Sequence, residues 1–357
     1  MGQSDDQNKL FDDYFGALKQ DLDAATKFFG PQIFETVYLG GGTPSVVPVS
    51  YLKDFFASLR QMHQISTNAE ITIECNPNSI DAEKIATYQA LGINRISLGA
   101  QTLHEQPFDT LGRIHTIDQT IKALELLSQA KFPNWSVDLM FGLPHQTLVQ
   151  LKTDVDRMML YAPTHISIYG LILEKQTEFG KKFSAHQSPL PTEDVEADMY
   201  EFLLTELPER GYDNYEISNF AQTGFESRHN QSYWTEKNYL GLGISAASFV
   251  TGQRFSHTHN FSKYLENPGL DYARLMERPS KKNERLAEKL FLMLRTRAGL
   301  REAMLTDWEH DQFTSHKRNN LEKWLESGHL RHDPQNSVWT LTPKGKMIAN
   351  SVMAELV

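Results

Sequence analysis

Four polar side chains lie at or just beyond the ends of predicted strands and could together bind a ligand. They are two carboxylates, Glu74 and Asp138, an amide, Gln101, and a guanidinium, Arg113. The carboxyl ends of parallel strands meet at one rim, so these groups could face a polar ligand that carries hydroxyls and a carboxylate. Taken one at a time, each is an ordinary surface group. The residues alone leave both interpretations open.

A run of three glycines, Gly40, Gly41 and Gly42, follows a predicted strand and continues into Thr43 and Pro44. Glycine has no Cβ, so consecutive backbone groups can approach a carboxylate, a phosphate or an amine. The GxxxxGK[ST] pattern of a phosphate-binding P-loop is absent. The run can equally be a tight turn without a ligand.

His229 lies in the segment RHNQSYW, between Arg228 and two aromatic residues, Tyr233 and Trp234. A histidine in these surroundings could be an axial ligand of haem iron, with rings to stack on the macrocycle and an arginine to meet a propionate. The alternative is a partly buried histidine whose hydrogen bonds are satisfied within the protein.

Two further patterns resemble sites but are better explained otherwise. His257 and His259 have the spacing of metal ligands on one side of a strand, yet no third ligand is evident nearby. Gly241, Gly243 and Ala246 match the spacing of a dinucleotide fingerprint, but no strand and helix unit surrounds them. We interpret the first pattern as structural and the second as a chance match.

The composition is that of a folded protein: of 357 residues, 40% are hydrophobic and 22% are charged. The net charge of −10 argues against a general nucleic-acid binder. No apolar run reaches the roughly 20 residues that cross a bilayer, and the polar, acidic start is not a secretory signal. We therefore expect a cytoplasmic protein that does not bind nucleic acid.

A single cysteine, Cys75, excludes an internal disulfide and any site that needs two or more thiolates from this chain. A zinc ribbon, or an iron–sulfur cluster held by the chain's own cysteines, cannot form.

The elements that position these residues alternate between helix and strand over the first half of the chain. Apolar periodicity predicts strands at 36–39, 71–74, 95–98, 135–140 and 165–169, and helices at 10–29, 49–62, after Ser79 or Asp81, at 117–130 and at 148–160. This alternation predicts an α/β fold with parallel strands. An open sheet and a barrel both fit, and the polar or glycine cluster that ends each strand favours the barrel. The chain begins on a helix, whereas a βα unit should begin on a strand.

The alternation ends near residue 172. A helix at 193–209 precedes a stretch rich in glycine, histidine and aromatic residues, and from about residue 283 the chain is mostly helical with one small hairpin at 332–341. The predicted division is a barrel at 1–172, a barrel extension at 173–280, and a winged-helix-like domain at 281–357. On so acidic a chain, we expect that last domain to pack or to contact protein rather than DNA.

Nine segments in order resemble the HemW branch of the radical S-adenosylmethionine (SAM) superfamily, which is closely related to oxygen-independent coproporphyrinogen III oxidase. They are VYLGGGTPS (37–45), ITIECNPNS (71–79), NRISLGAQT (94–102), LGRIHT (111–116), SVDLMFGLPHQT (136–147), SIYGLILEKQTEF (167–179), YEISNFA (215–221), RHNQSYW (228–234) and YLGLGISAASF (239–249). The resemblance covers nearly the whole chain. It implies a partial (β/α)6, TIM-like barrel followed by the family's C-terminal domain.

The resemblance also implies two ligands and their residues. The family's SAM contacts fall on Gly41, Gly42, Thr43, Glu74, Gln101, Arg113, Asp138, Gly170 and Ala247. The glycines would meet the methionine amine, Arg113 its carboxylate, and Asp138 and Gln101 the ribose hydroxyls. The motif HNxxYW, which distinguishes the branch from true oxidases, would bind haem iron through His229.

The chain departs from the family in one respect. Members carry a strand that ends in CxxxCxxC, whose three thiolates hold a 4Fe-4S cluster, and no such motif occurs here. Cys75 lies in a different turn and cannot replace three ligands. We expect that the chain lacks an N-terminal piece of the family protein, rather than being a natural cluster-free variant.

The resemblance predicts a haem chaperone that binds haem, contacts the membrane at most peripherally, and passes haem to respiratory haem proteins. The chain as it stands is not expected to be an enzyme. One alternative is a radical SAM oxidoreductase that acts on coproporphyrinogen III in porphyrin biosynthesis. The other is a cluster-free adaptor.

Overall fold

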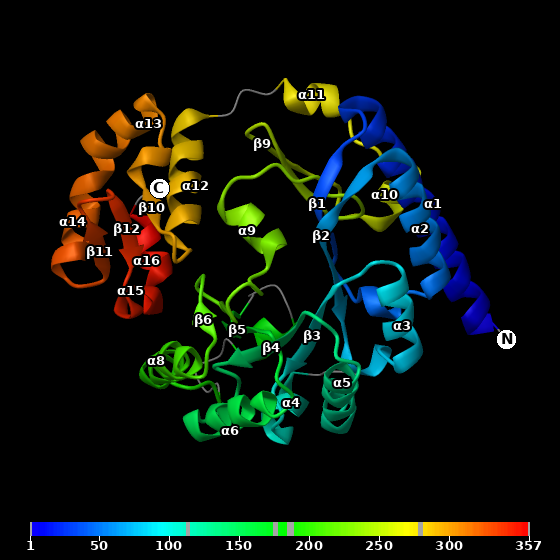
Figure 1. Cartoon of the computed structure of the whole chain (residues 1–357), viewed down its shortest axis with the longest axis horizontal. Helices are drawn as coiled ribbons and strands as arrows, with labels where there is room; N and C mark the ends of the chain where they lie inside the picture. The colour runs from blue at the N-terminus through cyan, green and yellow to red at the C-terminus, as the bar shows by residue number, and fades with distance from the viewer. Residues whose placement is uncertain (1, 112–114, 174–177, 184–188, 278–280, 356–357) are drawn as a thin grey trace.

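The strands between residues 33 and 221 form one curved sheet. A computed structural model describes residues 2–111, 115–173, 178–183, 189–277 and 281–355 (Figure 1). The seven-stranded sheet has the order β1-β2-β3-β4-β5-β7-β6. Its strands are β1 (Ile33–Leu39), β2 (Gln64–Cys75), β3 (Arg95–Gln101), β4 (Trp135–Phe141), β5 (His165–Gly170), β6 (Asp213–Asn214) and β7 (Asn219–Ala221). Strands β1 to β5 are parallel, and the short β7 and β6 add an antiparallel edge.

Helices cover the convex side of this sheet (Figure 1). They include α2 (Val49–Met62), α3 (Ala82–Ala90), α5 (Ile117–Gln129), α6 (Leu148–Met159) and α8 (Glu193–Glu209). Apolar residues such as Ile73, Leu98 and Val137 alternate along the strands and are fully buried in the core between sheet and helices. The other set of positions carries polar side chains such as Glu74 and Asp138. Because side chains of a strand alternate between faces, the concave side is left polar.

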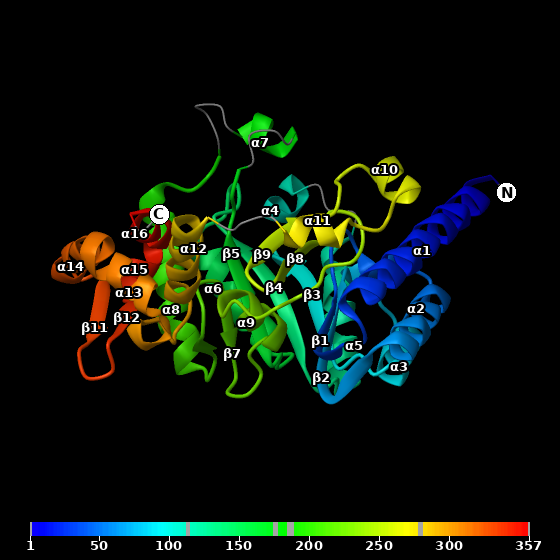
Figure 2. The same cartoon turned by 90° about the horizontal axis from the view of Figure 1, so that it is seen from above.

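The segment after the sheet folds over the concave side and joins the N-terminal helix α1 (Gly2–Phe29). It holds α9 (Arg228–Trp234), the hairpin β8 (Ala247–Val250) and β9 (Gln253–Ser256), and the helices α10 (Phe261–Glu266) and α11 (Tyr272–Met276). Helix α9 lies inside the curve of the sheet (Figure 1). Two short helices, α4 (Glu105–Thr110) and α7 (Glu178–Phe183), lie in loops at one rim of the sheet (Figure 2).

The C-terminal part has a hydrophobic core of its own, with Trp339 and Leu290 fully buried in it. Its elements are α12 (Lys282–Leu294), β10 (Leu300–Arg301), α13 (Asp307–Gln312), α14 (Arg318–Glu326), β11 (Leu330–Asp333), β12 (Val338–Leu341), α15 (Pro343–Met347) and α16 (Ala349–Ala354). The three strands form an antiparallel sheet of order β10-β12-β11, which gives the element order of a winged helix. Arg297 reaches back to Asp213 of β6 at 3.0 Å.

The predicted α/β fold with a partial barrel of parallel strands is therefore confirmed, in the form of a curled sheet. Helices α2 and α8 have the predicted bounds, and each predicted strand is present. The antiparallel edge strands β6 and β7 were not predicted. None of the helices in the described part of the chain combines the length and the apolarity that a membrane crossing needs.

Candidate functional site

Glu74 and Asp138 lie on the concave side of the sheet, and the strand register brings them together with a group of serines. Ser97 on β3 stands opposite Glu74 on β2, and Ser167 on β5 stands opposite Asp138 on β4. Ser97 donates a hydrogen bond to the Asp138 carboxylate at 2.9 Å, and Ser136 donates another at 3.1 Å. Burial raises the pKa of Asp138, while these hydroxyls lower it and the charge of Glu74 raises it further. Two carboxylates and several hydroxyls thus share one polar surface.

The glycine run lies beside Glu74 and leaves open space. The backbone N–H of Gly41 donates to Glu74 Oε2 at 3.0 Å. A Cβ on Gly40 would lie 2.4 Å from the Tyr38 ring, so this position requires glycine. Gly41 and Gly42 have φ of 82° and 63°, and a Cβ on either would meet nothing within 4 Å. The run is a left-handed turn with free space on its outer side, followed by Thr43 and the short 3-10 helix η1 (Pro44–Val46).

Gln101 ends β3 in an unusual state. It has a φ of 70°, its side chain is buried, and its Oε1 has no hydrogen-bond partner among the described residues. A buried amide oxygen without a donor is costly, so a hydroxyl or N–H of a ligand would be favoured there.

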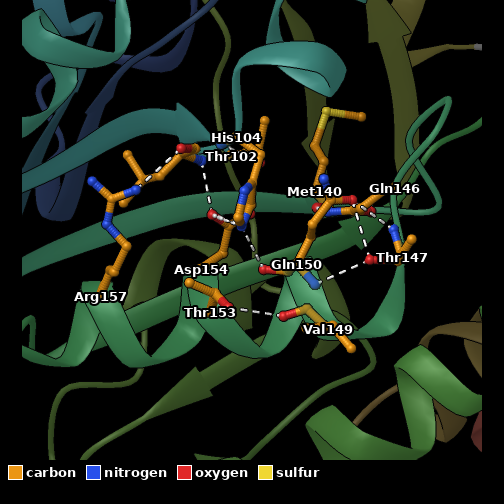
Figure 3. A network of polar contacts seen from close by, with 11 residues as sticks. Thr102, His104, Met140, Gln146, Thr147, Val149, Gln150, Thr153, Asp154 and Arg157 are labelled. Atoms are coloured by element: carbon orange, nitrogen blue, oxygen red, sulfur yellow. Dashed lines mark hydrogen bonds and ion pairs between the residues drawn. The ribbon is translucent and has the colours of Figure 1, made fainter.

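A buried carboxylate holds the loop that follows Gln101 (Figure 3). Asp154 of α6 accepts from Thr102 Oγ1 at 2.6 Å and from the Leu103 backbone at 2.8 Å. His104 Nε2 lies 3.7 Å from the same carboxylate. Desolvation raises the pKa of Asp154, and the hydrogen bond from Thr102 is the largest opposing effect. Asp154 was not predicted, although an acidic residue within the apolar stripe of α6 is a signal for such a role.

Three expected SAM contacts remain. Gly170 ends β5, beside the Phe141 ring. Ala247 is exposed on β8 and lines a hollow together with Tyr233. Arg113 lies outside the described residues.

His229 is half-buried on α9, and both of its ring nitrogens have partners. Nδ1 lies 2.8 Å from Thr36 Oγ1 of β1, and Nε2 lies 2.7 Å from the Tyr233 hydroxyl. Either neutral tautomer satisfies both contacts, because the hydroxyls of Thr36 and Tyr233 can each donate or accept. Burial lowers the pKa of His229 to about 4, so the ring is neutral at neutral pH.

The start of α9 is fixed by a second buried carboxylate. Glu70 of β2 accepts from the backbone N–H of Arg228 at 3.1 Å and from that of His229 at 2.9 Å. Ser227 caps the same turn by accepting from the Asn230 backbone. The position of His229 is therefore set by the sheet as well as by its own helix.

Tyr38 connects His229 with the strand-end carboxylates. Its hydroxyl donates to Glu74 Oε1 at 2.7 Å, and its ring stacks on His229 with centroids 4.8 Å apart and 16° between the planes. Desolvation, followed by the nearby charge of Glu74, raises the pKa of Tyr38, so it stays a hydrogen-bond donor. Neither Tyr38 nor Thr36 was predicted, because their contacts depend on strand pairing and on the position of α9.

An open hollow of about 490 Å³ lies next to α9. Its lining residues are Tyr233, Trp234, Tyr239, Ala247, Arg254, Glu288 and Leu292. They come from α9, the hairpin β8–β9, the segment before it, and α12. Tyr233 therefore faces the hollow and also holds His229.

The other histidine and glycine patterns have structural roles. His257 is buried 3.3 Å from Asp21, while His259 is exposed and bonds to Ser245, so the two histidines do not converge. Among the described residues no group of three His, Cys, Asp or Glu could hold a metal ion. A Cβ on Gly241 would lie 2.3 Å from the Ala247 carbonyl oxygen, so this glycine permits a close backbone approach.

The residues present fit SAM and haem but not an iron–sulfur cluster. Gln101 offers an unpaired oxygen, the glycine turn offers open backbone, and His229 offers a neutral imidazole. Cys75 is buried in the core under the sheet, and that burial raises its thiol pKa to about 12. One protonated, buried thiol does not supply the three thiolates of such a cluster.

The chain is similar in sequence and in structure to known proteins of one superfamily. Residues 9–158 match the model of the radical SAM superfamily. The chain is 36% identical to heme chaperone HemW of Lactococcus lactis over 74% of this chain and 70% of that protein. It is 31% identical to heme chaperone HemW of Bacillus subtilis over 97% of this chain and 91% of that protein. In structure it is similar to the radical SAM enzyme coproporphyrinogen III oxidase HemN from Escherichia coli, with a TM-score of 0.82, 19% identity, and 100% and 84% of the two chains covered.

Proposed function

The chain belongs to the HemW family of the radical SAM superfamily, and we propose that it is a haem chaperone that binds haem iron through Nε2 of His229. Following its resemblance to the family, we further propose that it works in the cytoplasm and passes haem to respiratory haem proteins at the membrane. Its curated relatives carry the name heme chaperone.

The observation that carries this proposal is the state of His229. An imidazole ligates iron through a nitrogen lone pair, and a pKa of about 4 leaves that pair free of a proton at neutral pH. When Nε2 binds iron, the ring proton lies on Nδ1, and Thr36 Oγ1 can accept a hydrogen bond from it. The Tyr233 hydroxyl occupies Nε2 only through a hydrogen bond, which the iron can replace.

We propose that the strand ends bind SAM next to this site. Gln101 Oε1 and the Asp138 carboxylate would accept from ribose hydroxyls, and the turn at Gly41, Gly42 and Thr43 would approach the methionine end. Glu74 holds that turn in place. Gly170, Ala247 and Arg113 stay proposed contacts on the resemblance alone. In radical SAM proteins a 4Fe-4S cluster supplies the electron that activates SAM, and the thiolates for it are not among the residues of this chain.

The test is a titration with ferric haem followed at the Soret band. The wild-type chain should bind about one haem with a shifted Soret maximum, and His229→Ala should lose the shift. His259→Ala is the matched control, because that histidine is exposed and bonds only to Ser245 in the described structure, and it should behave as wild type. A shift that survives in His229→Ala would refute the proposed ligand. No haem binding by any variant would instead favour the adaptor.

A further inference from the structure

The hollow beside α9 has the lining that a planar, acidic macrocycle requires. We propose that it seats the porphyrin ring of haem, with one propionate on Arg254 and with Tyr233 as the side chain that turns aside when iron reaches His229. This inference rests on the proposed haem function and adds to it the place and the contacts of the ring.

Aromatic side chains form the wall of the hollow. Tyr233 meets Tyr239 edge to face, with centroids 4.6 Å apart, and Trp234 lies beside them. The guanidinium of Arg295 covers the Trp234 ring at 4.6 Å and holds it in place. The Trp234 Nε1 is buried and has no partner in the described part of the chain. Aromatic rings can pack against a porphyrin either face to face or edge to face.

One cation stands in the hollow. Arg254 forms an ion pair with Glu288 at 2.6 Å, donates to the Tyr239 hydroxyl, and is about 42% exposed. A propionate can therefore reach the guanidinium from solvent and take over the place of the Glu288 carboxylate. Arginine can bind a carboxylate through two parallel hydrogen bonds, whereas Glu288 makes one contact with Arg254, so a propionate can compete for the guanidinium. Glu288 opposes an acidic ligand, and its removal should strengthen binding.

Tyr233 separates the hollow from the proposed iron ligand. Its side chain lines the hollow, and its hydroxyl lies 2.7 Å from His229 Nε2. Iron in the hollow reaches this nitrogen only after the hydroxyl has left it. Removing the hydroxyl should therefore raise the affinity for haem, because no hydrogen bond is then broken when the iron binds.

The hollow is also built from two separate parts of the chain. Tyr233 and Trp234 belong to α9, whereas Glu288 and Leu292 belong to α12 at the start of the C-terminal part. A ring seated there would contact both parts and so would make the position of α12 sensitive to haem.

The experiment uses metal-free protoporphyrin IX, which can occupy the seat without an iron ligand, and its dimethyl ester, which lacks free carboxylates. Quenching of tryptophan fluorescence reports binding to the full chain. Arg254→Gln should lower the affinity for protoporphyrin IX about tenfold and leave the affinity for the ester unchanged. Glu288→Gln should raise the affinity for protoporphyrin IX. Tyr233→Phe should bind ferric haem about fivefold more tightly. Arg210→Gln, which removes an arginine from an ion pair at the end of α8, is the matched control and should have no effect.

Each outcome separates the seat from the proposed function. If ferric haem binds through His229 while Arg254→Gln and Glu288→Gln leave the affinity for protoporphyrin IX unchanged, the ring does not lie in the hollow, but the proposed haem function is retained. If ferric haem shows no His229 signature but protoporphyrin IX still depends on Arg254, the seat is supported and the iron ligand is wrong. Displacement of protoporphyrin IX by saturating SAM would assign the hollow, including Ala247, to SAM and overturn the proposal. Loss of binding in Tyr233→Phe would overturn its role as the side chain that turns aside.

Discussion

The ring of Tyr38 stacks on the imidazole of His229, with centroids 4.8 Å apart and 16° between the planes. The hydroxyl of the same tyrosine donates to Glu74, which in turn accepts from the Gly41 backbone. One side chain thus contacts both the proposed haem ligand and the proposed SAM site. A change of structure at either site can therefore reach the other through the Tyr38 side chain.

The two contacts of Tyr38 can be separated by substitution. Tyr38→Phe keeps the ring stack but removes the bond to Glu74, so SAM affinity should fall about tenfold, the effect of one hydrogen bond to a charged group, while haem affinity stays unchanged. Tyr38→Ala should lower the affinity for both SAM and haem. Calorimetric SAM titrations and Soret titrations measure the two effects. Tyr51→Phe, which removes an exposed hydroxyl from Asp12, is the control. Equal losses of SAM and haem affinity in Tyr38→Phe would contradict this separation.

Thr36→Val should lower haem affinity by about tenfold while it leaves the fold intact. Valine has nearly the shape of threonine but cannot form a hydrogen bond with Nδ1 of His229, so the ring loses the bond that orients it. Soret titration gives the affinity, and circular dichroism checks the fold. Thr205→Val removes a hydroxyl that bonds only within α8 in the described structure and should change nothing. Wild-type haem affinity in Thr36→Val would show that Thr36 does not position the ligand.

Haem affinity should be nearly constant from pH 8 down to about pH 5. Burial lowers the pKa of His229 to about 4, so protons compete with iron for Nε2 only near and below that pH. Below it, affinity should fall about tenfold per pH unit. Soret titrations across this range, with His259→Ala as a control, measure the profile. A loss centred between pH 6 and pH 7 would mean that His229 titrates like an exposed histidine.

Asp21 should make the stability of the protein depend on pH. It is fully buried on α1, where it accepts from the Gly243 backbone and from Tyr264, and desolvation raises its pKa from 3.8 to about 6. A raised folded-state pKa favours folding most below pH 4, and this contribution is lost as the pH rises through 6. Relative to Asp21→Asn, the wild type should therefore lose about 3 kcal/mol of unfolding free energy between pH 4 and pH 7.

Urea unfolding at a series of pH values tests this expectation. Asp23→Asn removes an exposed carboxylate from the same helix, where it pairs with Lys27, and should show no such change relative to wild type. A constant difference between wild type and Asp21→Asn across this range would show that Asp21 does not titrate with a raised pKa.

Much of the barrel could be predicted because its signals are local. Helix α2 has the predicted bounds, since its apolar spacing is regular and Pro48 stands before it. Strands β6 and β7 have two and three residues, and they are defined only by pairing: β7 pairs with β5, and β6 pairs with β7, so no local pattern marks them. Strand β2 begins earlier than predicted, at Gln64, because its first part pairs with β1 across a shift in register.

The site, too, contains residues that local sequence patterns predict and residues that they do not. Glu74, Gln101 and Asp138 were found because polar residues at strand ends are visible in sequence, and His229 because of its motif. Tyr233, four positions from His229, was named with that motif, whereas Tyr38, Thr36 and Glu70 were not predicted, because their contacts join separate parts of the chain. Thr36 and His229 are 193 positions apart, and Glu70 reaches α9 over a similar distance.

Imidazole rescue of His229→Gly tests the central claim, that His229 is the iron ligand, most directly. Glycine at this position leaves space for a free imidazole between Thr36 and the iron. Ferric haem added to His229→Gly should lack the wild-type Soret maximum. Millimolar imidazole should restore that maximum after the spectrum of haem and imidazole without protein has been subtracted. Failure of imidazole to restore the spectrum, with wild-type haem binding retained in the variant, would contradict ligation by His229.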